Sequence, residues 1–409
     1  MSDIRQNYAR LVLTRGVSLQ PGQILVIDAP VWTSGFVRLL TEEAFRLGAR
    51  DVVTHYADPD ADRLRLQYAD EETLCDIPRW QVESQTLYGE KNACFLRLDS
   101  GDPDGMAGVD PARLSLWKKA VSAPLEGLRL KKMSNDLAWS GVPVPNCRWA
   151  KKVFPQMGEA EALEALWQAV YRCCYVSGES AEAGWDAHVE EMQRNVRKIN
   201  ALGVRSLHFQ NGKGTDLTLE LCDGAVFAGG ICHCPEPDGI VFAPNIPTEE
   251  ILTTPHRDKV NGVVYNTLPL VYGGSVIDDF CLTFRDGEVV DWRCGQGAEV
   301  LAGILDTDGG TRRLGEVALV PFDSPINQLG VLFYDTLFDE NASCHLALGA
   351  GYVDVIPGGD RSKEALIARG LNTSMLHVDF MFGSRDMRCT ARDAVGREVE
   401  IFRDGLFVI

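Results

Sequence analysis

The N-terminal part of the chain alternates short apolar runs with a longer amphipathic stretch. Residues 24–27 are all apolar, as in a buried parallel strand. The residues after Ser34 place apolar side chains at helical spacing as far as Gly48, which suits a helix C-terminus. Residues 51–56 predict a second strand and residues 93–98 a third. This pattern predicts a β-α-β unit with parallel strands, and therefore an open α/β domain.

The C-terminal half has a different pattern. Apolar positions between Trp185 and Ile199 recur in steps of four and three, which predicts a long amphipathic helix that ends at Gly203. Beyond this helix, short apolar or alternating segments such as residues 216–221 and 317–320 predict strands joined by turns. These segments favour an α+β fold with a dominant mixed sheet.

Loop-forming residues at positions 177–180 precede the long helix. We therefore expect two domains: an open α/β N-terminal domain over residues 1–180 and a larger mixed-sheet, metal-binding catalytic domain over residues 181–409. The length of 409 residues agrees with this division, because it exceeds what one ordinary core supports. The expected fold class is α/β combined with α+β.

The net charge and the apolar content exclude several classes of protein. A formal charge of −18 without a basic patch argues against nucleic-acid binding. The longest basic cluster, residues 129–132, is expected to be a solvated strand end. Neither a membrane-spanning run nor an N-terminal signal core is present in the sequence, so we expect a cytoplasmic protein without a membrane partner.

Twelve cysteines lie at irregular spacing, and without a secretory signal they are expected to be reduced thiols. Cys232, His233 and Cys234 suggest a metal site. However, a structural zinc site needs four ligands, and no second pair lies nearby in the sequence. We give this cluster little weight, and the role of its three residues stays open.

Two apolar segments are preceded by glutamates. Glu249 and Glu250 are adjacent on a polar turn, where two carboxylates repel each other unless a cation lies beside them. The simpler interpretation is two solvated glutamates at a helix N-terminus. Glu316 lies at the start of the apolar segment 317–320, and the simpler interpretation there is an edge residue facing water.

Two further segments carry both histidine and carboxylate. Glu340 lies in a polar loop that leads to His345 at the start of an apolar segment. A histidine in that position is more often a hydrogen-bonded core residue than a ligand. His377 and Asp379 are two residues apart on a predicted strand and therefore share one face. Burying both without partners would be costly, which favours a divalent metal.

Together these segments supply four carboxylates and two imidazoles within one expected domain. Two divalent cations carry four positive charges, which offset the four carboxylates. The set therefore suits a hydrolytic site with two cations about 3.5–4 Å apart. Histidine and carboxylate ligands suit zinc, cobalt or manganese.

Four motifs in the C-terminal half carry a resemblance to a known family: NIPTEE at 245–250, LGEVALV at 314–320, DENASCHLALGAGY at 339–352 and HVDFMFG at 377–383. The chain resembles the M29 family of metallo-aminopeptidases, the aminopeptidase T and aminopeptidase S group, over essentially its whole length. The resemblance implies a homodimer with an enclosed active-site cavity and a catalytic tyrosine, Tyr352. It also implies metal ligands at Glu250, Glu316, Glu340, His345, His377 and Asp379.

The expected function is a two-metal aminopeptidase that removes the N-terminal residue from peptides with a free N-terminus, by attack of a metal-bridging hydroxide. Tyr352 would donate a hydrogen bond to the tetrahedral oxyanion. Glu249 is the candidate general base, argued from its position beside a ligand and from adjacent glutamate pairs in other two-metal aminopeptidases. An acidic pocket would hold the ammonium group of the substrate.

Three alternatives remain open from the sequence. His345, His377 and Asp379 form a set that suits a mononuclear non-haem Fe(II) ring-cleaving dioxygenase. Such a site does not need the three glutamates. A non-enzymatic binding protein with a vestigial site is a second alternative. A hydrolase with Cys344 as nucleophile beside His345 is the third, although adjacent residues on an extended chain point apart.

Overall fold

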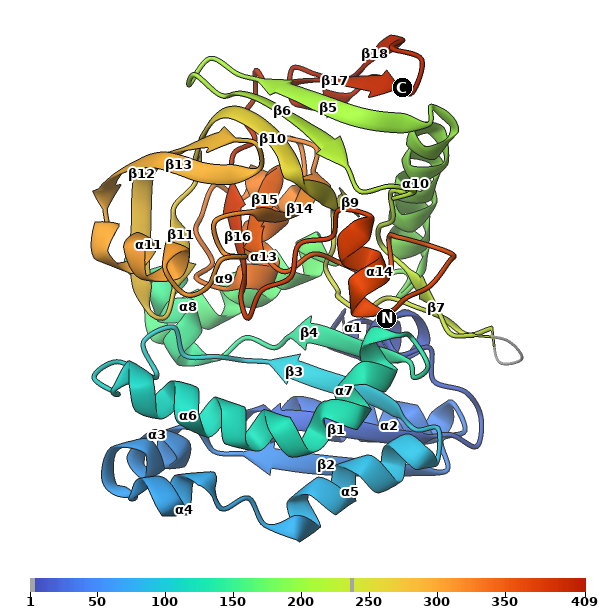
Figure 1. Ribbon diagram of the computed structural model, residues 1–409. Helices are drawn as coiled ribbons and strands as arrows, with labels where there is room; N and C mark the ends of the chain where they lie inside the picture. Colours follow the sequence, from blue (N-terminus) through green and yellow to red (C-terminus); the bar gives the residue numbers. More distant parts are fainter. Residues whose placement is uncertain (1–3, 236–238) are drawn as a thin grey trace. The chain divides into compact units, whose positions relative to one another are not determined.

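The computed structural model describes residues 4–235 and 239–409 (Figure 1). The chain forms two compact units, Met1–His188 with Ile231–Pro247, and Val189–Gly230 with Thr248–Ile409. The expected mixture of a parallel α/β part and a larger, mainly antiparallel part is confirmed. The division at residues 180 and 181 did not include the return of the segment 231–247 to the first unit. The assignment of residues 1–180 and 181–409 as separate functional domains stays a prediction.

The first unit is built on a parallel sheet with the order β2-β1-β3-β4. Its central strand β1 is almost fully buried, as an uninterrupted apolar run requires when helices cover both faces. The β-α-β prediction is therefore confirmed. The strands are β1 (Ile24–Pro30), β2 (Asp51–Ala57), β3 (Cys94–Asp99) and β4 (Trp139–Pro143). The helices are α1 (Ile4–Leu11), which continues into a π-helical turn (Val12–Gly16), α2 (Ser34–Arg46), α3 (Pro59–Tyr68), α4 (Glu71–Cys75), α5 (Arg79–Glu90), α6 (Pro111–Ser122), α7 (Glu126–Met133), α8 (Cys147–Val153) and α9 (Glu159–Cys173).

Backbone hydrogen bonds attach the segment 231–247 to the first unit. The amide of Ala243 donates to the carbonyls of Arg15 and Gly16 at 2.9 and 3.0 Å, and the amide of Gly141 donates to Pro244 O at 2.8 Å. The segment also forms the small ribbon of β7 (Cys232–His233) and β8 (Val241–Phe242). The hydrogen bonds to Arg15, Gly16 and Gly141 join residues more than a hundred positions apart, so local pattern could not predict them.

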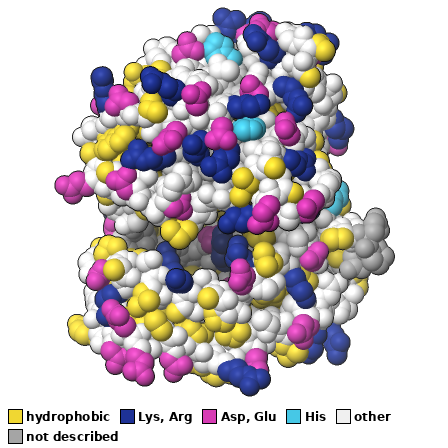
Figure 2. Space-filling model, viewed as in Figure 1, with side chains coloured by type: hydrophobic (Ala, Val, Ile, Leu, Met, Phe, Trp, Pro, Cys, Tyr) yellow, Lys and Arg dark blue, Asp and Glu magenta, His cyan; other side chains and the backbone are white. Residues whose placement is uncertain are grey.

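The expectation for the basic cluster at residues 129–132 is wrong. These residues belong to helix α7, in which Leu128 is buried and the remaining face is mostly exposed. Lys131 and Lys132 lie in its last turn, where positive side chains interact favourably with the helix C-terminus. Lysine and arginine are interspersed with aspartate and glutamate on the visible face of each unit (Figure 2).

The second unit contains a large antiparallel sheet with the order β11-β12-β10-β6-β5-β17-β18-β19, to which β13 is added through β12. The long helix predicted from residue 185 is α10 (Ala183–Ala201). The strands of this sheet are β5 (Val204–Gln210), β6 (Asp216–Leu221), β10 (Pro255–Tyr265), β11 (Leu270–Tyr272), β12 (Ser275–Arg285), β13 (Glu288–Gln296), β17 (Arg388–Asp393), β18 (Glu398–Arg403) and β19 (Leu406–Phe407).

A second antiparallel sheet, with the order β16-β15-β14-β9, carries most of the candidate site. Its strands are β9 (Ile251–Thr253), β14 (Leu314–Leu319), β15 (His345–Gly349) and β16 (His377–Met381). The helices of this part are α11 (Ala298–Leu305), α12 (Pro325–Gln328), α13 (Thr336–Glu340) and α14 (Lys363–Ala368). Every residue of β14 and β15 is buried, so both faces of these two strands are shielded from water. Within the two described ranges, no helix has the length and apolarity needed to cross a membrane.

Candidate metal centre

The candidate site lies on one face of the β14-β15-β16 sheet. Successive side chains on a strand point to opposite faces, so Glu316, His345, His377 and Asp379 can share a face while their neighbours fill the core. Strand register brings them together: Glu316 is opposite Ala347, and Ala347 is opposite Asp379. Because alanine lies between the two carboxylates, space remains above the middle strand for a ligand.

Two glycines allow the strands to approach closely at this site. A Cβ at Gly315 would lie 2.2 Å from Ala350 O, and a Cβ at Gly349 would lie 2.1 Å from Leu376 O. The strand register shifts between Leu314 and Glu316, so that Glu316 lies opposite Ala347. Ala350 O accepts a hydrogen bond from His377 Nδ1 at 2.7 Å. The glycines therefore bring a backbone carbonyl to the position where it orients an imidazole.

One group of possible ligands consists of Glu250, Glu316 and His345. Each offers an atom that lies within 4.8 Å of the atoms of the other two. His345 Nε2 is 3.1 Å from Glu250 Oε2 and 3.8 Å from Glu316 Oε1. The other imidazole nitrogen, His345 Nδ1, is 3.2 Å from Ser343 O. Since a carbonyl only accepts, Nδ1 carries a proton and Nε2 points to the carboxylates.

A second group consists of Glu316, His377 and Asp379, within the same limit of 4.8 Å. His377 Nε2 is 3.0 Å from Glu316 Oε2 and 3.3 Å from Asp379 Oδ1. The hydrogen bond of His377 Nδ1 to Ala350 O directs Nε2 to the carboxylates in the same way as in the first group. Glu316 belongs to both groups, and its two oxygens face different histidines.

Buried polar atoms without a hydrogen-bond partner indicate whether a cation fits these groups. Among the described residues, the buried side-chain atoms without a hydrogen-bond partner include Glu316 Oε1, His345 Nε2 and Asp379 Oδ1. Orphaned buried polar atoms are rare in proteins and need an explanation. His345 Nε2 and Asp379 Oδ1 do have close neighbours, but these contacts lack hydrogen-bond alignment. Atoms that converge on a point without bonding one another fit ligands of a cation.

Burial and mutual contact set the protonation of the site. Burial opposes the charge of Glu316, but His345 and His377 outweigh it and lower its pKa to about 2. Burial also opposes the charge of both imidazoles. The surrounding carboxylates nevertheless raise the pKa of His377 to about 11 and that of His345 well above its ordinary value. The carboxylates therefore favour the charged form of both imidazoles, and a cation that binds to an imidazole nitrogen in place of its proton would release that proton.

Glu340, the last residue of α13, lies beside these groups but in neither of them. Burial, followed by the charges of Asp379 and Glu250, raises its pKa well above the ordinary value. Burial also raises the pKa of Glu250, with Glu316 as a further cause. A carboxylate in this position is costly without added positive charge, which agrees with a ligand.

Glu249 is buried with 4% of its surface exposed, and the side chain of Glu250 is 13% exposed. The simpler interpretation of this pair as solvated glutamates is therefore wrong. The residues lead into the short strand β9, and the amide of Glu249 donates to Asn341 Oδ1 at 2.7 Å. Glu316 is also not an edge residue facing water, because β14 lies inside the sheet and Glu316 is 2% exposed. Long-range pairing buries all three side chains.

Tyr352 lies next to the second group. Its ring packs edge-on against His377, with 5.0 Å between the ring centroids. Burial, and then the charges of Glu316 and Asp379, raise the pKa of its hydroxyl well above the ordinary value. The phenol therefore keeps its proton at neutral pH and can donate a hydrogen bond.

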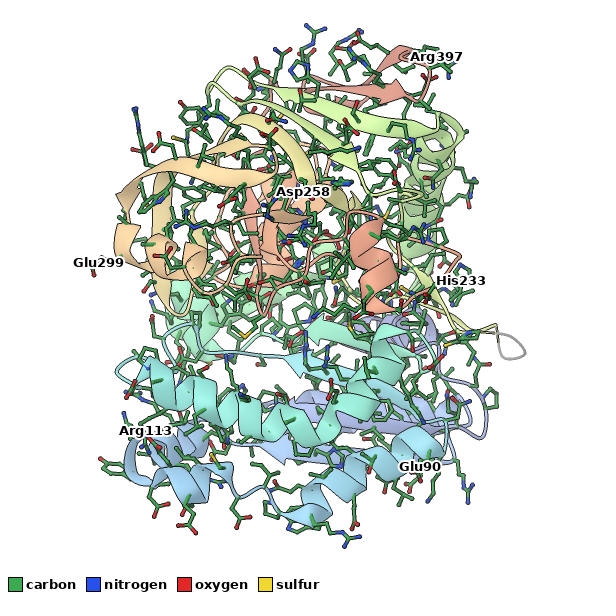
Figure 3. The ribbon with its side chains drawn as sticks, viewed as in Figure 1. Glu90, Arg113, His233, Asp258, Glu299 and Arg397 are labelled. Atoms are coloured by element: carbon green, nitrogen blue, oxygen red, sulfur yellow. The ribbon has the colours of Figure 1, made fainter. Side chains whose placement is uncertain are left out.

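Two of the alternatives lose their geometric support. Cys344 faces Val320, and burial raises the pKa of its thiol to about 11, so it is not an activated nucleophile. The dioxygenase set is divided, because His345 belongs to one group and His377 with Asp379 to the other, and Glu316 stands in both. The groups do not include Cys232, His233 or Cys234, and His233 lies at the surface (Figure 3).

Sequence reasoning missed Asn341. This buried side chain accepts from Glu249 N and donates through Nδ2 to Leu337 O at 2.9 Å, so it ties the turn before β9 to helix α13. The position of Asn341 next to the candidate ligand Glu340 was the local signal for it. The small residues Ala347 and Gly349, alternating with leucines in an apolar strand, were a clearer signal for an open face.

Comparisons with known proteins find similar sequences and a similar structure over nearly the whole chain. The profile of a family described as thermophilic metalloprotease (M29) matches residues 2–407. Aminopeptidase 2 of Geobacillus stearothermophilus is 41% identical over 399 residues, which cover 97% of this chain and 96% of the relative. Aminopeptidase T of Thermus thermophilus is 38% identical over 404 residues, 99% of this chain and 98% of the relative. The structure of wild-type AmpT from Thermus thermophilus matches with a TM-score of 0.92 and 36% identity, and covers 99% of each chain.

Proposed function

The chain belongs to the thermophilic metalloprotease family M29 and is a metal-dependent hydrolase, and from this premise we propose that it is an aminopeptidase that works with two divalent cations. Proteins of similar sequence that carry the name aminopeptidase match it over nearly their whole length. This kinship, together with the glutamates of the site, leaves the dioxygenase alternative without support.

The observation that carries the two-metal proposal is the shared position of Glu316. One of its oxygens faces His345 and the other faces His377, so a single carboxylate can link two cations. The first cation would be held by Glu250, Glu316 and His345, and the second by Glu316, His377 and Asp379. Glu340 would complete the set. Zinc, cobalt and manganese all suit these ligands.

Bound divalent cations supply Lewis acidity, which polarises a peptide carbonyl and lowers the pKa of water. The chain supplies the remaining functions. Two divalent cations would offset its four candidate ligand carboxylates, so the neighbouring Glu249 would leave the loaded site with an excess of negative charge, which favours the ammonium group of a free peptide N-terminus. That charge explains removal of the terminal residue in preference to cleavage within a peptide.

Tyr352 would stabilise the oxyanion that forms on the reacting carbonyl. Its hydroxyl remains protonated because burial and nearby carboxylates raise its pKa. Its contact with His377 keeps the ring beside the second ligand group. A donor that is fixed in advance stabilises developing charge without reorganisation.

Glu249 would act as the general base that takes a proton from water and passes it to the leaving amine. Its backbone is fixed by Asn341, and its side chain is buried next to a ligand without belonging to either ligand group. Glu249→Gln should keep the metal content and lower kcat by roughly 10²–10⁴-fold. Glu250→Gln is the matched control, since it should lose metal. Loss of metal in Glu249→Gln would make Glu249 a ligand instead.

Peptides with a free N-terminus are the proposed substrates. The homodimer and the cytoplasmic location expected from the sequence stay predictions.

Hydrolysis of paired peptides tests the proposed function. The purified protein, loaded with zinc, cobalt or manganese, is given a dipeptide and its N-acetylated form, and release of the first amino acid is followed. We expect release only from the free peptide, and its loss after chelation. Equal cleavage of the acetylated peptide would contradict an aminopeptidase.

A further inference from the structure

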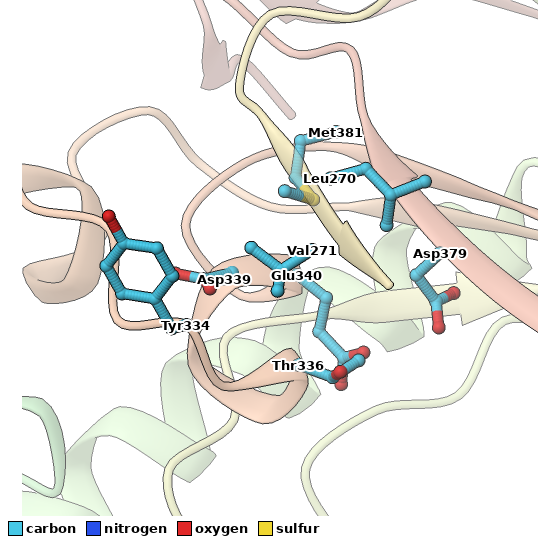
Figure 4. Close-up of a pocket in the computed structure, with 8 residues that line it drawn as sticks. All are labelled: Leu270, Val271, Tyr334, Thr336, Asp339, Glu340, Asp379 and Met381. Atoms are coloured by element: carbon cyan, nitrogen blue, oxygen red, sulfur yellow. The ribbon is translucent and has the colours of Figure 1, made fainter. Parts of the chain in front are cut away.

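We propose that the hollow beside Glu340 and Asp379 receives the side chain of the substrate's N-terminal residue, and that it selects aliphatic residues of medium size. The inference rests on the proposed function, because it places a specificity pocket next to the candidate ligands. The hollow is lined by Leu270, Val271, Tyr334, Thr336, Asp339, Glu340, Asp379 and Met381 (Figure 4).

The lining divides into a polar end and an apolar wall. Glu340 and Asp379 form the polar end, and their carboxylates point the same way in the close-up view (Figure 4). Leu270, Val271 and Met381 form the apolar wall. A pocket that fixes one polar end and is otherwise apolar is typical of small-ligand sites.

The strands place this wall directly beside the ligands. Met381 is two residues from Asp379 on β16, so both side chains lie on the same face. The loop before β11 is fixed to β16 by a hydrogen bond from Thr267 N to Met381 O at 2.8 Å. The α-carbon of an N-terminal residue carries both the ammonium group and the side chain. A pocket for the side chain must therefore adjoin the acidic groups, as this hollow does.

The opposite wall is a tyrosine in an uncommon backbone conformation. Tyr334 has φ +56°, a region that non-glycine residues rarely adopt. Asp339 holds this turn, since its carboxylate accepts from Phe333 N at 2.8 Å and from Asp335 N at 3.1 Å. Backbone strain of this kind is commonly found at functional sites.

The same hydrogen bonds occupy the carboxylate of Asp339. Both oxygens of Asp339 are engaged by backbone amides, so this carboxylate stabilises its own loop. The wall that remains for a substrate side chain is a leucine, a valine and a methionine. Aliphatic side chains such as those of leucine and methionine match this wall, and the flat ring of phenylalanine is broader.

Substitutions at Val271 test the pocket in both directions. Val271 is half-buried in the hairpin strand β11, so its replacement disturbs little of the core. Val271→Ala widens the hollow and Val271→Phe narrows it. Val276 is the matched control: it is a half-buried valine directly opposite Val271 in the strand pair, and it does not line the hollow.

The measurement is kcat/KM of the metal-loaded protein for three dipeptides that differ only in the first residue: alanine, leucine and phenylalanine. We expect Val271→Ala to raise the ratio of phenylalanine to leucine about tenfold, and Val271→Phe to lower the ratio of leucine to alanine about tenfold. Both Val276 variants should leave the ratios unchanged.

The outcomes separate this inference from the proposed function. Unchanged ratios in both Val271 variants, with normal metal content and alanine release, would overturn the pocket alone. No amino-acid release from any peptide by the wild type would overturn the aminopeptidase proposal itself. If the Val271 variants lose metal, Met381→Leu carries the test, because it replaces an unbranched wall side chain by a branched one of similar volume. This changes the shape of the hollow and should shift the preference between leucine and methionine. An unchanged leucine-to-methionine ratio there would also overturn the inference.

Discussion

The two faces of the β14-β15-β16 sheet are both largely hidden from water, and they are chemically opposite. One face presents Val317, Leu346, Val378 and their alternating neighbours to the main core of the second unit. The other presents Glu316, His345, His377 and Asp379 to one another. A single step along any of these strands moves from one environment to the other.

The difference shows what each face contributes. Apolar side chains on the core face need only close packing and no hydrogen-bond partner. The acidic face leaves Glu316, His345 and Asp379 each with a buried atom that has no hydrogen-bond partner. Such a face destabilises the fold unless positive charge completes it, and this loss of stability is common at functional sites.

Glu316→Ala should have the largest effect, because it removes the carboxylate common to both ligand groups. We expect loss of both cations and a fall in activity on the order of 10⁴-fold or more, as for a member of a catalytic unit. Metal analysis and peptide hydrolysis measure the two losses. Retention of both cations would show that Glu316 does not link them.

Tyr352→Phe should separate catalysis from metal binding. Removal of one donor to an oxyanion typically lowers kcat by about 10²–10³-fold. The cations should remain, because Tyr352 belongs to neither ligand group. Steady-state kinetics and metal content are measured on the same preparation. Full activity would remove Tyr352 from the mechanism.

Leu346→Ala tests the core face, one residue away from His345. Leu346 is fully buried, so its truncation should lower the free energy of unfolding by about 3 kcal/mol. Denaturant unfolding measures this cost. The folded fraction should still bind both cations and hydrolyse peptides. Loss of metal at full stability would mean that the two faces are not independent.

Glu340→Gln should have the smallest effect, which is a gain in the stability of the metal-free protein. The pKa of Glu340 is raised in the folded state, mainly by burial. At pH values below its ordinary pKa of 4.5, Glu340 is protonated in both the folded and the unfolded chain, so it does not lower the free energy of unfolding. As pH rises above 4.5, the unfolded chain ionises first and the folded state loses stability.

The metal-free Glu340→Gln protein should therefore be more stable than the wild type by about 0.5–2 kcal/mol at pH 8, and by less at pH 5. Thermal unfolding at the two pH values measures the change. Glu299→Gln is the control, because Glu299 is exposed on α11 (Figure 3). A gain that is equal at both pH values would contradict the assigned cause.

Much of the fold and of the site could be predicted because it depends on local spacing. The parallel strands β1 and β2 follow from apolar runs separated by a helical stretch. The shared face of His377 and Asp379 follows from their spacing of two. Helix α14 also has local signals at both ends, with Ser362 as its N-cap and Gly370 at φ +100° after it.

The rest depends on contacts that local pattern does not contain. Glu249 was ambiguous because a solvated turn and a buried one have the same sequence, and only the bond to Asn341, 92 residues away, decides between them. The attachment of residues 231–247 to the first unit depends on backbone pairs of the same long range. The sequence identified six possible ligands but not their grouping. That Glu316 belongs to both groups follows from the register of β14, β15 and β16.

Direct location of the cations tests the central claim. Crystals of the protein loaded with zinc or manganese, measured by anomalous diffraction, would place each ion. The account predicts two cations in each chain, one at Glu250 and His345, the other at His377 and Asp379, with Glu316 bound to both. A single cation, or two cations of which one does not contact Glu316, would contradict it.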